Sequence, residues 1–313
     1  MVKEDFYFDS SDGKTKIHGV KWIPDGNVKM ILQVVHGVTE HILRYDEFAN
    51  YFNNMGIMVV GIDLIGHGTS IAVGVKPMYF GGVGSFEYVV DDLYKCKEII
   101  SKDFDSNITY CMLGFSLGSF LARMYAIKYP SDLDGMILVG TGYTSSIEIA
   151  LARFIANKEA HKYGEDKSSD MIRKLTFETY NNKFKPNRTR YDWLCLSEEA
   201  LEKYINDPLR GGDMSSGLFR EMLYGMKFTG EKSNIMRMNK ELPILLLSGS
   251  DDPVGNSGKG INKYNTILKK CGINDVDIKI YSKLRHDILH EDNRVDIYND
   301  IREWLVNKGF LVI

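Results

Sequence analysis

The sequence predicts an α/β fold with a mostly parallel central sheet, helices on both faces of the sheet and an inserted helical cap. Short apolar runs typical of buried strands recur along the chain, and amphipathic stretches typical of helices separate them. One interval, residues 143–238, has several helical stretches but no strong strand signal, and structureless loops of that length are rare in compact domains. We therefore expect a core built from residues 1–142 and 239–313, with a helical cap at 143–238 between two strands.

The expected elements follow in order along the chain. Asp12-Gly13 separates two apolar stretches, residues 6–8 and 17–20, which indicates an antiparallel hairpin. Apolar runs predict buried strands, and an alternating pattern predicts a last strand, at residues 30–35, 58–62, 108–113, 136–139, 244–247 and 276–281. Amphipathic patterns predict helices at residues 44–55, 86–100, 117–128, 261–270 and 295–306.

The composition excludes several classes of protein. The 313 residues carry a formal net charge of −3, so the chain lacks the basic excess of a general nucleic-acid binder. A hydrophobic fraction of 44% is typical of a globular protein and excludes a disordered or fibrous one. We therefore expect a globular enzyme with no nucleic-acid partner, and the sequence carries no signal for its oligomeric state.

The cysteines and the N-terminus indicate a cytoplasmic protein. The four cysteines lie far apart and form no Cys-x-x-Cys pair, so we expect free thiols rather than a zinc or redox motif. The first residues are acidic where a signal peptide needs a basic start, and no apolar run approaches the roughly 18 residues of a membrane span.

The strongest chemical signal is the segment Gly114-Phe115-Ser116-Leu117-Gly118. It follows a predicted strand directly and precedes a predicted helix. A serine on such a tight turn needs small residues two positions away on either side, and the turn exposes its hydroxyl at the helix N-terminus, where developing negative charge is favoured. We therefore expect Ser116 to be a nucleophile.

A serine nucleophile needs a general base and a carboxylate that orients the base, each in a loop after a strand. Asp251 and Asp252 follow the run at 244–247, and either could be the acid. His286 follows the strand at 276–281, whereas His290 lies further from the strand end, so we favour His286 as the base.

At these residues the chain resembles the α/β-hydrolase family, and within it the monoglyceride lipase and lysophospholipase-like group, also called serine-aminopeptidase-like hydrolases. The resemblance covers most of the chain, and its motifs occur in the same order. They are His36-Gly37-Val38-Thr39-Glu40-His41 with Arg44-Tyr45, Asp63-Leu64-Ile65-Gly66-His67-Gly68-Thr69-Ser70, Gly249-Ser250-Asp251-Asp252, and a cap motif from Asp192-Trp193-Leu194 to Asn206-Asp207-Pro208-Leu209. The resemblance implies an α/β-hydrolase fold, Asp252 as the acid, and an oxyanion hole formed by the backbone N–H groups of Val38 and Leu117.

Other histidines and motifs fit less well. His36 and His67 lie outside the Ser–Asp–His order and are expected to shape loops, while His18 and His161 are expected at the surface. The run from His286 to His290 imitates a zinc helix, but its acid is one methylene short and no third ligand follows. A glycine-rich stretch at residues 255–260 fails as a phosphate loop. No metal or other cofactor is expected.

The cap is expected to select the substrate. Met222 belongs to an apolar stripe at 218–226, and a second stripe is formed by residues 147, 151, 154 and 155. Such stripes usually pack against the rest of the protein. Flexible methionine side chains can also line a pocket for an acyl chain. Glu40 and Arg44 are candidates either for contact with a glycerol head or for an ion pair that stabilises their loop. The basic run at 183–190 is typical of a solvated loop, and its alternative role is a transient contact of the cap with an anionic membrane surface.

The expected activity is hydrolysis of a carboxylic ester, with a single-chain lipid such as a monoacylglycerol or lysophospholipid as the substrate. The alternatives are a short-chain carboxylesterase, an aminopeptidase or amidase with the same triad, or a fold that binds a small ligand without catalysis.

Overall fold

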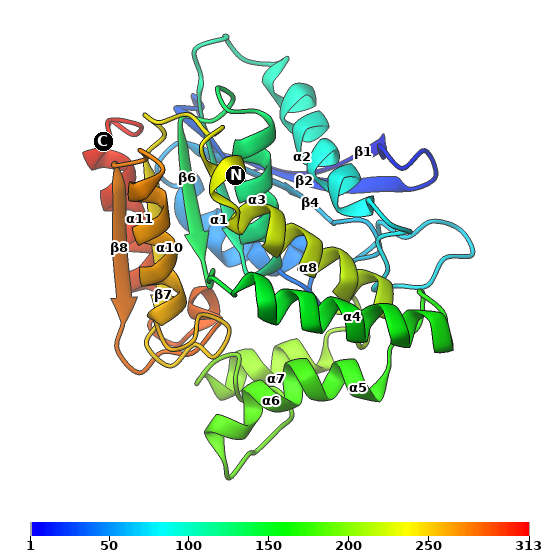
Figure 1. Cartoon of the computed structure of the whole chain (residues 1–313). Helices are drawn as coiled ribbons and strands as arrows, with labels where there is room; N and C mark the ends of the chain where they lie inside the picture. Colours follow the sequence, from blue (N-terminus) through cyan, green and yellow to red (C-terminus); the bar gives the residue numbers. More distant parts are fainter. Residues whose placement is uncertain (1, 313) are drawn as a thin grey trace.

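The computed structural model describes residues 2–312, and its described strands form one eight-stranded sheet with the order β1-β2-β4-β3-β5-β6-β7-β8 (Figure 1). Strands β1 and β2 form the predicted hairpin, β2 pairs antiparallel with β4, and all later pairings are parallel. The strands are β1 Val2–Asp9, β2 Lys16–Ile23, β3 Met30–Val35, β4 Ile57–Ile62, β5 Thr109–Phe115, β6 Gly135–Val139, β7 Ile244–Gly249 and β8 Val276–Tyr281. The predicted fold class is confirmed.

The central strands are buried along their whole length. Every residue of β3, β4, β6 and β7 is buried, which explains why these strands are continuous apolar runs in the sequence. The last strand, β8, lies at the edge of the sheet, and its residues are all exposed or half-buried.

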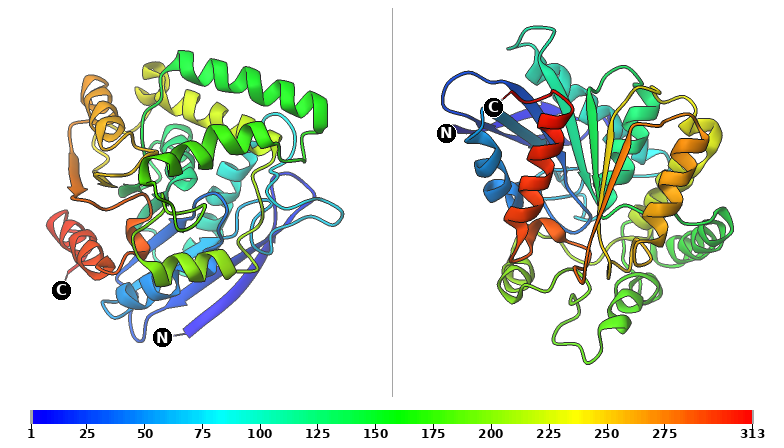
Figure 2. Two further views of the ribbon diagram at one scale, coloured as in Figure 1. Left: turned by 90° about the horizontal axis from the view of Figure 1, so that it is seen from below. Right: turned by 90° about the vertical axis from the view of Figure 1, so that its left-hand side faces the viewer.

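Helices cover both faces of the sheet (Figure 2). On one face α1 (Asp46–Asn53) and α11 (Arg294–Asn307) share an aromatic cluster in which the rings of Phe48 and Tyr298 meet edge to face at 5.1 Å. On the other face lie α2 (Ser85–Ser101), α3 (Leu117–Lys128) and α10 (Lys259–Lys270).

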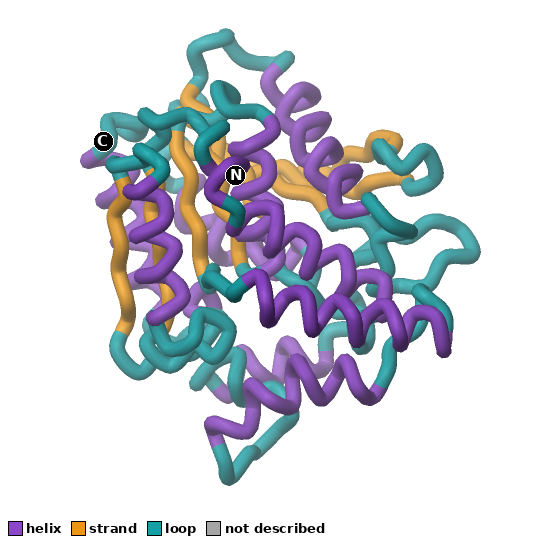
Figure 3. Tube along the Cα trace, in the orientation of Figure 1, coloured by secondary structure: helices purple, strands orange, loops and turns teal. Residues whose placement is uncertain are grey.

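The interval between β6 and β7 is helical, and within the described residues it contains no strand (Figure 3). Its long helices, α4 (Ser146–Tyr163) and α8 (Ser216–Gly230), lie side by side, and α8 also packs against α2 and α3 (Figure 1). Between them lie α5 (Asp170–Arg173), a π-helical turn (Lys174–Glu178), α6 (Thr179–Asn181), a 3-10 turn (Asn182–Phe184) and α7 (Glu198–Asn206), and α9 (Lys232–Ile235) follows α8. Helix α8, near the end of the interval, thus belongs to the layer of helices that covers this face of the sheet.

A buried arginine links the start of this interval to the last turn of α8. Arg123 on α3 donates hydrogen bonds of 2.9 Å to the carbonyl oxygens of Gly142, just after β6, and of Thr229, near the end of α8. Its guanidinium lies 3.6 Å from the centre of the Tyr264 ring. None of the helices in residues 2–312 has the length and apolar character needed to cross a membrane.

Candidate active site

Ser116 occupies a strained turn between β5 and α3. Its backbone has φ 52° and ψ −116°, a left-handed region that non-glycine residues rarely adopt. A Cβ atom on Gly118 would overlap the carbonyl oxygen of Val35, and one on Gly114 would overlap the backbone of Gly118. Both glycines of the Gly-x-Ser-x-Gly segment are therefore required by close backbone packing, as the sequence predicted.

The structure brings Ser116, His286 and Asp252 together at the carboxyl ends of three strands. The Nε2 atom of His286 lies 2.9 Å from the Ser116 hydroxyl oxygen, and its Nδ1 atom lies 2.9 Å from the Oδ1 atom of Asp252. The Asp252 carboxylate is completely buried and also accepts a 2.9 Å hydrogen bond from the Val254 backbone N–H. This geometry can carry a proton from the serine hydroxyl to the imidazole.

The alternatives to these residues point elsewhere. Asp251 has a half-exposed side chain whose carboxylate lies 3.3 Å from the Nζ atom of Lys183. His290 has partners on both nitrogens: Nδ1 lies 2.8 Å from the Asp287 carboxylate, and Nε2 lies 3.1 Å from the Arg44 carbonyl oxygen. Because both nitrogens of His286 are also engaged, neither ring offers the free nitrogen that a zinc site would need.

The residues expected to form the oxyanion hole lie on two neighbouring segments. Leu117 is the first residue of α3, so its backbone N–H has no carbonyl one turn earlier in the helix. Val38 follows the end of β3, and the tight packing of Gly118 against the carbonyl oxygens of Val35 and His36 brings these two segments together. Their role in holding an oxyanion stays a prediction.

Glu40, in the loop after β3 (residues 36–41), forms an ion pair with Arg44. The buried Glu40 carboxylate also accepts hydrogen bonds from the Gly37 backbone N–H and the Tyr45 hydroxyl. Arg44 reaches Asp287, one residue after His286, at 3.1 Å. The geometry favours the ion-pair alternative over contact with a glycerol head.

The partners of Asp287 keep it ionised. Burial alone would raise the pKa of Asp287, but His290 and Arg44 hold the pKa well below its usual range. The Glu40–Arg44–Asp287 chain therefore links the loop after β3 to the loop after β8.

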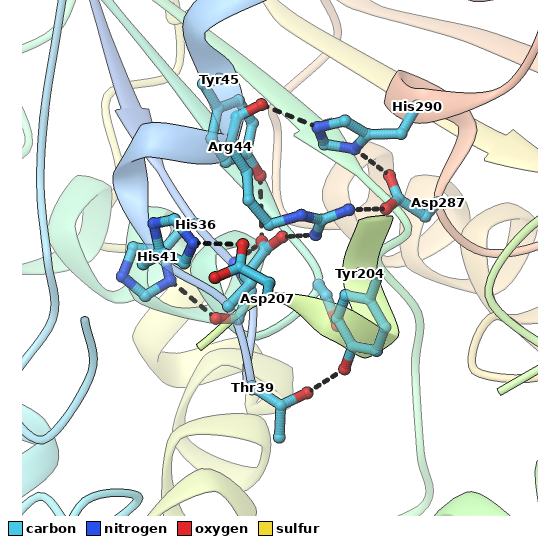
Figure 4. Close-up of polar contacts among 12 residues, drawn as sticks. His36, Thr39, His41, Arg44, Tyr45, Tyr204, Asp207, Asp287 and His290 are labelled. Atoms are coloured by element: carbon cyan, nitrogen blue, oxygen red, sulfur yellow. Dashed lines mark hydrogen bonds and ion pairs between the residues drawn. The ribbon is translucent and has the colours of Figure 1, made fainter. Parts of the chain in front are cut away.

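Helix α7 packs against the same loop, residues 36–41 (Figure 4). The Thr39 and Tyr204 hydroxyl oxygens lie 2.6 Å apart, and the Nε2 atom of His41 lies 2.7 Å from the Asp207 carboxylate. The Arg44 guanidinium lies 5.1 Å from the centre of the Tyr204 ring. The sequence motif at residues 206–209 thus serves to dock the helix.

His36 and His67 shape loops, as expected. The Leu64 backbone N–H donates to the Nε2 atom of His36 at 3.0 Å, and His67 Nδ1 lies 2.9 Å from the Ile65 carbonyl oxygen. Burial lowers the pKa of His36 to about 3 and that of His67 to about 4, so both rings are neutral at pH 7.

The expectation that His18 is a surface residue is wrong. Its ring is buried between Asp63 and Asp5, each 2.9 Å from one ring nitrogen, because pairing of β2 with β4 brings the ring to the loop that carries Asp63. Burial would raise the pKa of Asp63, but hydrogen bonds from His18 and from the Thr69 and Ile42 backbone lower it to about 2.

The two apolar stripes of the interval differ in their surroundings. The stripe on α8 packs into the core, with Leu218, Phe219 and Leu223 buried and Met222 half-buried against the same cluster, so a substrate contact of Met222 stays a prediction. On α4 the expected internal packing is wrong for Ile147, Leu151 and Phe154, which are 84%, 63% and 67% exposed. The helix turns its opposite side, including Ala156 and Ala160, toward the protein.

Trp193 is the site residue that the sequence did not reveal. Its indole ring packs on the His286 ring with a centroid distance of 5.3 Å, and the side chain is 4% exposed. Asp192-Trp193-Leu194 was visible as a cap motif, but the chain separation of 93 residues hides its contact with the histidine.

Comparisons with known proteins identify the family of this chain. Residues 26–293 match the family model described as serine aminopeptidase, S33. Monoglyceride lipase of Mus musculus is 26% identical over 92% of this chain and 86% of that protein, and monoacylglycerol lipase of Mycolicibacterium smegmatis is 22% identical over 91% of each. The crystal structure of a carboxyl esterase from Bacillus coagulans with glycerol superposes with a TM-score of 0.88 at 23% identity over 100% of both chains. That of a soluble variant of monoglyceride lipase from Saccharomyces cerevisiae with a substrate analogue has a TM-score of 0.75 at 17% identity, covering 100% of this chain and 97% of that one. The chain belongs to the serine aminopeptidase S33 family and is a serine hydrolase of the α/β-hydrolase fold.

Proposed function

We propose that the protein hydrolyses monoacylglycerols with Ser116 as nucleophile, His286 as general base and Asp252 as the orienting acid. The observation that carries this proposal is the hydrogen-bonded line from the Ser116 hydroxyl through His286 to the fully buried Asp252. The similarity to proteins named monoglyceride lipase and monoacylglycerol lipase supports the substrate class.

The reaction follows from the positions of these groups. His286 Nε2 takes the hydroxyl proton as Ser116 Oγ attacks the ester carbonyl carbon, and the Asp252 carboxylate stabilises the imidazolium that forms. The Val38 and Leu117 backbone N–H groups would hold the negative oxygen of the tetrahedral intermediate, each contributing roughly 3–4 kcal/mol. His286 then protonates the leaving glycerol, and a water molecule releases the fatty acid from Ser116 by the same route.

Acyl-chain length tests the lipid substrate. Each methylene that leaves water for an apolar tunnel contributes about 0.8 kcal/mol, which is about a fourfold rise in kcat/KM per carbon. We expect this rise for monoacylglycerols from two carbons upward until the chain outgrows the apolar surface that receives it, trimmed to about twofold where that surface is partly wet. Measurements are made below the micelle-forming concentration. A profile that peaks at two carbons and falls steadily would contradict the lipid substrate and favour a short-chain carboxylesterase. The Bacillus coagulans structure is named a carboxyl esterase.

We further propose that the exposed stripe of α4 meets a membrane surface while substrate is taken up. Ile147, Leu151 and Phe154 lie at i, i+4 and i+7 on one helix face, and a patch of large exposed apolar side chains marks an interaction surface. The basic run at residues 183–190 gives less support, because Lys183, Arg188 and Arg190 are paired with acidic side chains of the protein.

The four free, buried cysteines support a reducing compartment such as the cytoplasm.

Sedimentation with phosphatidylcholine vesicles tests this surface. Leu151→Glu should lower the bound fraction several-fold while hydrolysis of a short soluble ester is unchanged. Val295→Glu, at a 49% exposed position of α11 on the other face of the sheet, is the matched control and should bind as the wild type does. Equal binding of all three proteins would refute the proposal.

A further inference from the structure

The imidazole ring of His286 contacts two aromatic rings. The Phe115 ring, at the end of β5, has its centroid 5.0 Å from that of the imidazole with an angle of 39° between planes. The Trp193 indole, from the interval between β6 and β7, lies at 5.3 Å with an angle of 33°. Both aromatic side chains are buried, so water does not screen either contact.

The indole is held in place by its own neighbours. Its ring stacks on Phe177 at a centroid distance of 5.7 Å and 15°, and it meets Tyr180 at 5.2 Å. The Trp193 backbone N–H donates a 3.0 Å hydrogen bond to the side-chain oxygen of Asn181. These contacts fix the face that the ring presents.

The segment that carries Trp193 is also fastened to the loop that carries His286. The Arg285 guanidinium donates to the Asp192 carbonyl oxygen, and the Asp287 backbone N–H donates to the Leu194 carbonyl oxygen at 2.6 Å. One bond thus lies on each side of the tryptophan, and the two partners flank the histidine. The indole and the imidazole are therefore bound together as one unit.

From this geometry we propose that Trp193 is a positioning residue whose indole face stabilises the positively charged form of His286 during the reaction. The inference rests on the proposed role of His286 as the base. When the proton of Ser116 passes to Nε2, the ring becomes a cation, and a cation within about 6 Å of an indole centroid is attracted by the negative face of the ring. The neutral imidazole of the resting enzyme gains much less, so the attraction lowers the barrier rather than tightening substrate binding. The usual strength of such contacts corresponds to about a 2- to 30-fold effect on rate.

Fluorination of the indole tests the electrostatic part of this role. Fluorine atoms withdraw electron density from the face of the ring while scarcely changing its shape. With mono-, di- and tetrafluorotryptophan incorporated site-specifically at position 193, kcat should fall stepwise, to about one tenth of the wild-type value for the tetrafluoro ring, with KM nearly constant. The matched control is the same series at Trp304, whose ring packs on Phe310 and whose indole N–H donates to Asp277; kcat should not change there.

Ordinary variants add a second measurement. Trp193→Phe keeps an aromatic face and Trp193→Leu removes it, so kcat should fall in the order Trp, Phe, Leu, with equal factors for acetyl and octanoyl esters of p-nitrophenol. A flat fluorination series would overturn the proposal and leave Trp193 as a packing residue. Failure of the proposed triad would look different, because His286→Ala would then retain activity.

Discussion

The two neighbouring aspartates after β7 allow a sharp test of the triad, because one substitution can be made at two adjacent positions. We expect Asp252→Asn to lower kcat by about 10⁴-fold and Asp251→Asn to change it less than about fivefold. Asparagine has nearly the same shape as aspartate, so neither substitution opens a cavity.

The difference in magnitude follows from the surroundings of the two carboxylates. Asp252 is completely buried and lies 2.9 Å from His286 Nδ1. An amide NH₂ facing that nitrogen would place the imidazole proton on Nε2, where it blocks transfer from Ser116, and an amide oxygen would keep the tautomer but lose the charge that stabilises the imidazolium. A loss of 10⁴-fold corresponds to about 5.4 kcal/mol. The Asp251 side chain is 43% exposed and lies 3.3 Å from the Lys183 ammonium, and such surface pairs contribute about 0–1 kcal/mol.

The assay is steady-state hydrolysis of a soluble octanoyl ester, with thermal unfolding of each variant as the control for folding. Both variants should unfold within a few degrees of the wild type. The assignment of Asp252 would be refuted by the reverse ranking, or by an Asp252→Asn variant that keeps more than about a tenth of the wild-type kcat.

Three further predictions follow from the structure. Ser116→Ala should lower kcat by about 10⁶-fold and abolish labelling by a serine-directed phosphonate, without lowering the melting temperature; residual labelling would place the nucleophile elsewhere. Gly118→Ala should lower the free energy of unfolding, measured in urea, by about 2–3 kcal/mol, because the new Cβ meets the Val35 carbonyl oxygen. In the control Gly212→Ala the new Cβ meets no atom, so the free energy of unfolding should change by less than about 1 kcal/mol. Similar losses for both variants would refute the packing argument. Burial would lower the pKa of His18, but its hydrogen bonds to Asp63 and Asp5 raise that pKa above the value of 6.5 in the unfolded chain. The stability that the protonated His18 ring contributes to the fold is therefore complete below pH 6.5 and is lost as the pH rises through the higher folded pKa. His18→Gln should therefore lower the free energy of unfolding more at pH 5.5 than at pH 9, and an equal effect at both would contradict the shift.

The parts of the fold that the sequence predicts are those governed by local patterns. Strands β3, β4, β6 and β7 are buried on both faces, so each needs an uninterrupted apolar run, and such a run is visible without knowledge of its neighbours. The turn at Ser116 is equally local, since its two required glycines lie within two residues of the serine. Ser116, Asp252 and His286 follow strand ends in a fixed order, so the sequence could indicate that these three side chains lie close together, while their catalytic roles stay a prediction.

What the sequence does not predict depends on contacts between distant segments. His18 looks like an ordinary strand residue, and only the pairing of β2 with β4 brings it to Asp63. Arg44 and Asp287 are 243 positions apart, so the ion pair that joins the loops after β3 and β8 has no local signature. The apolar residues on α4 recur with the spacing of an amphipathic helix, and that spacing alone does not show whether the apolar face contacts protein or solvent.

The contrast between features with local sequence patterns and features made by contacts between distant segments also separates catalysis from substrate selection. The proposed triad lies at the strand ends of a rigid sheet, so its chemistry can be inferred from motifs and applies to any ester that reaches Ser116. Residues 192–207 belong to the helical interval, yet they are bound to the loops after β3 and β8 through Asp192, Leu194, Tyr204 and Asp207. We therefore expect substitutions in that segment to change kcat for short and long esters alike. Dependence on acyl length must then arise from α4, α8 and residues 164–191. Within residues 2–312, the side chains of these parts make no such bonds to the loops after β3, β7 and β8 apart from the contact of Lys183 with Asp251 and Ser257.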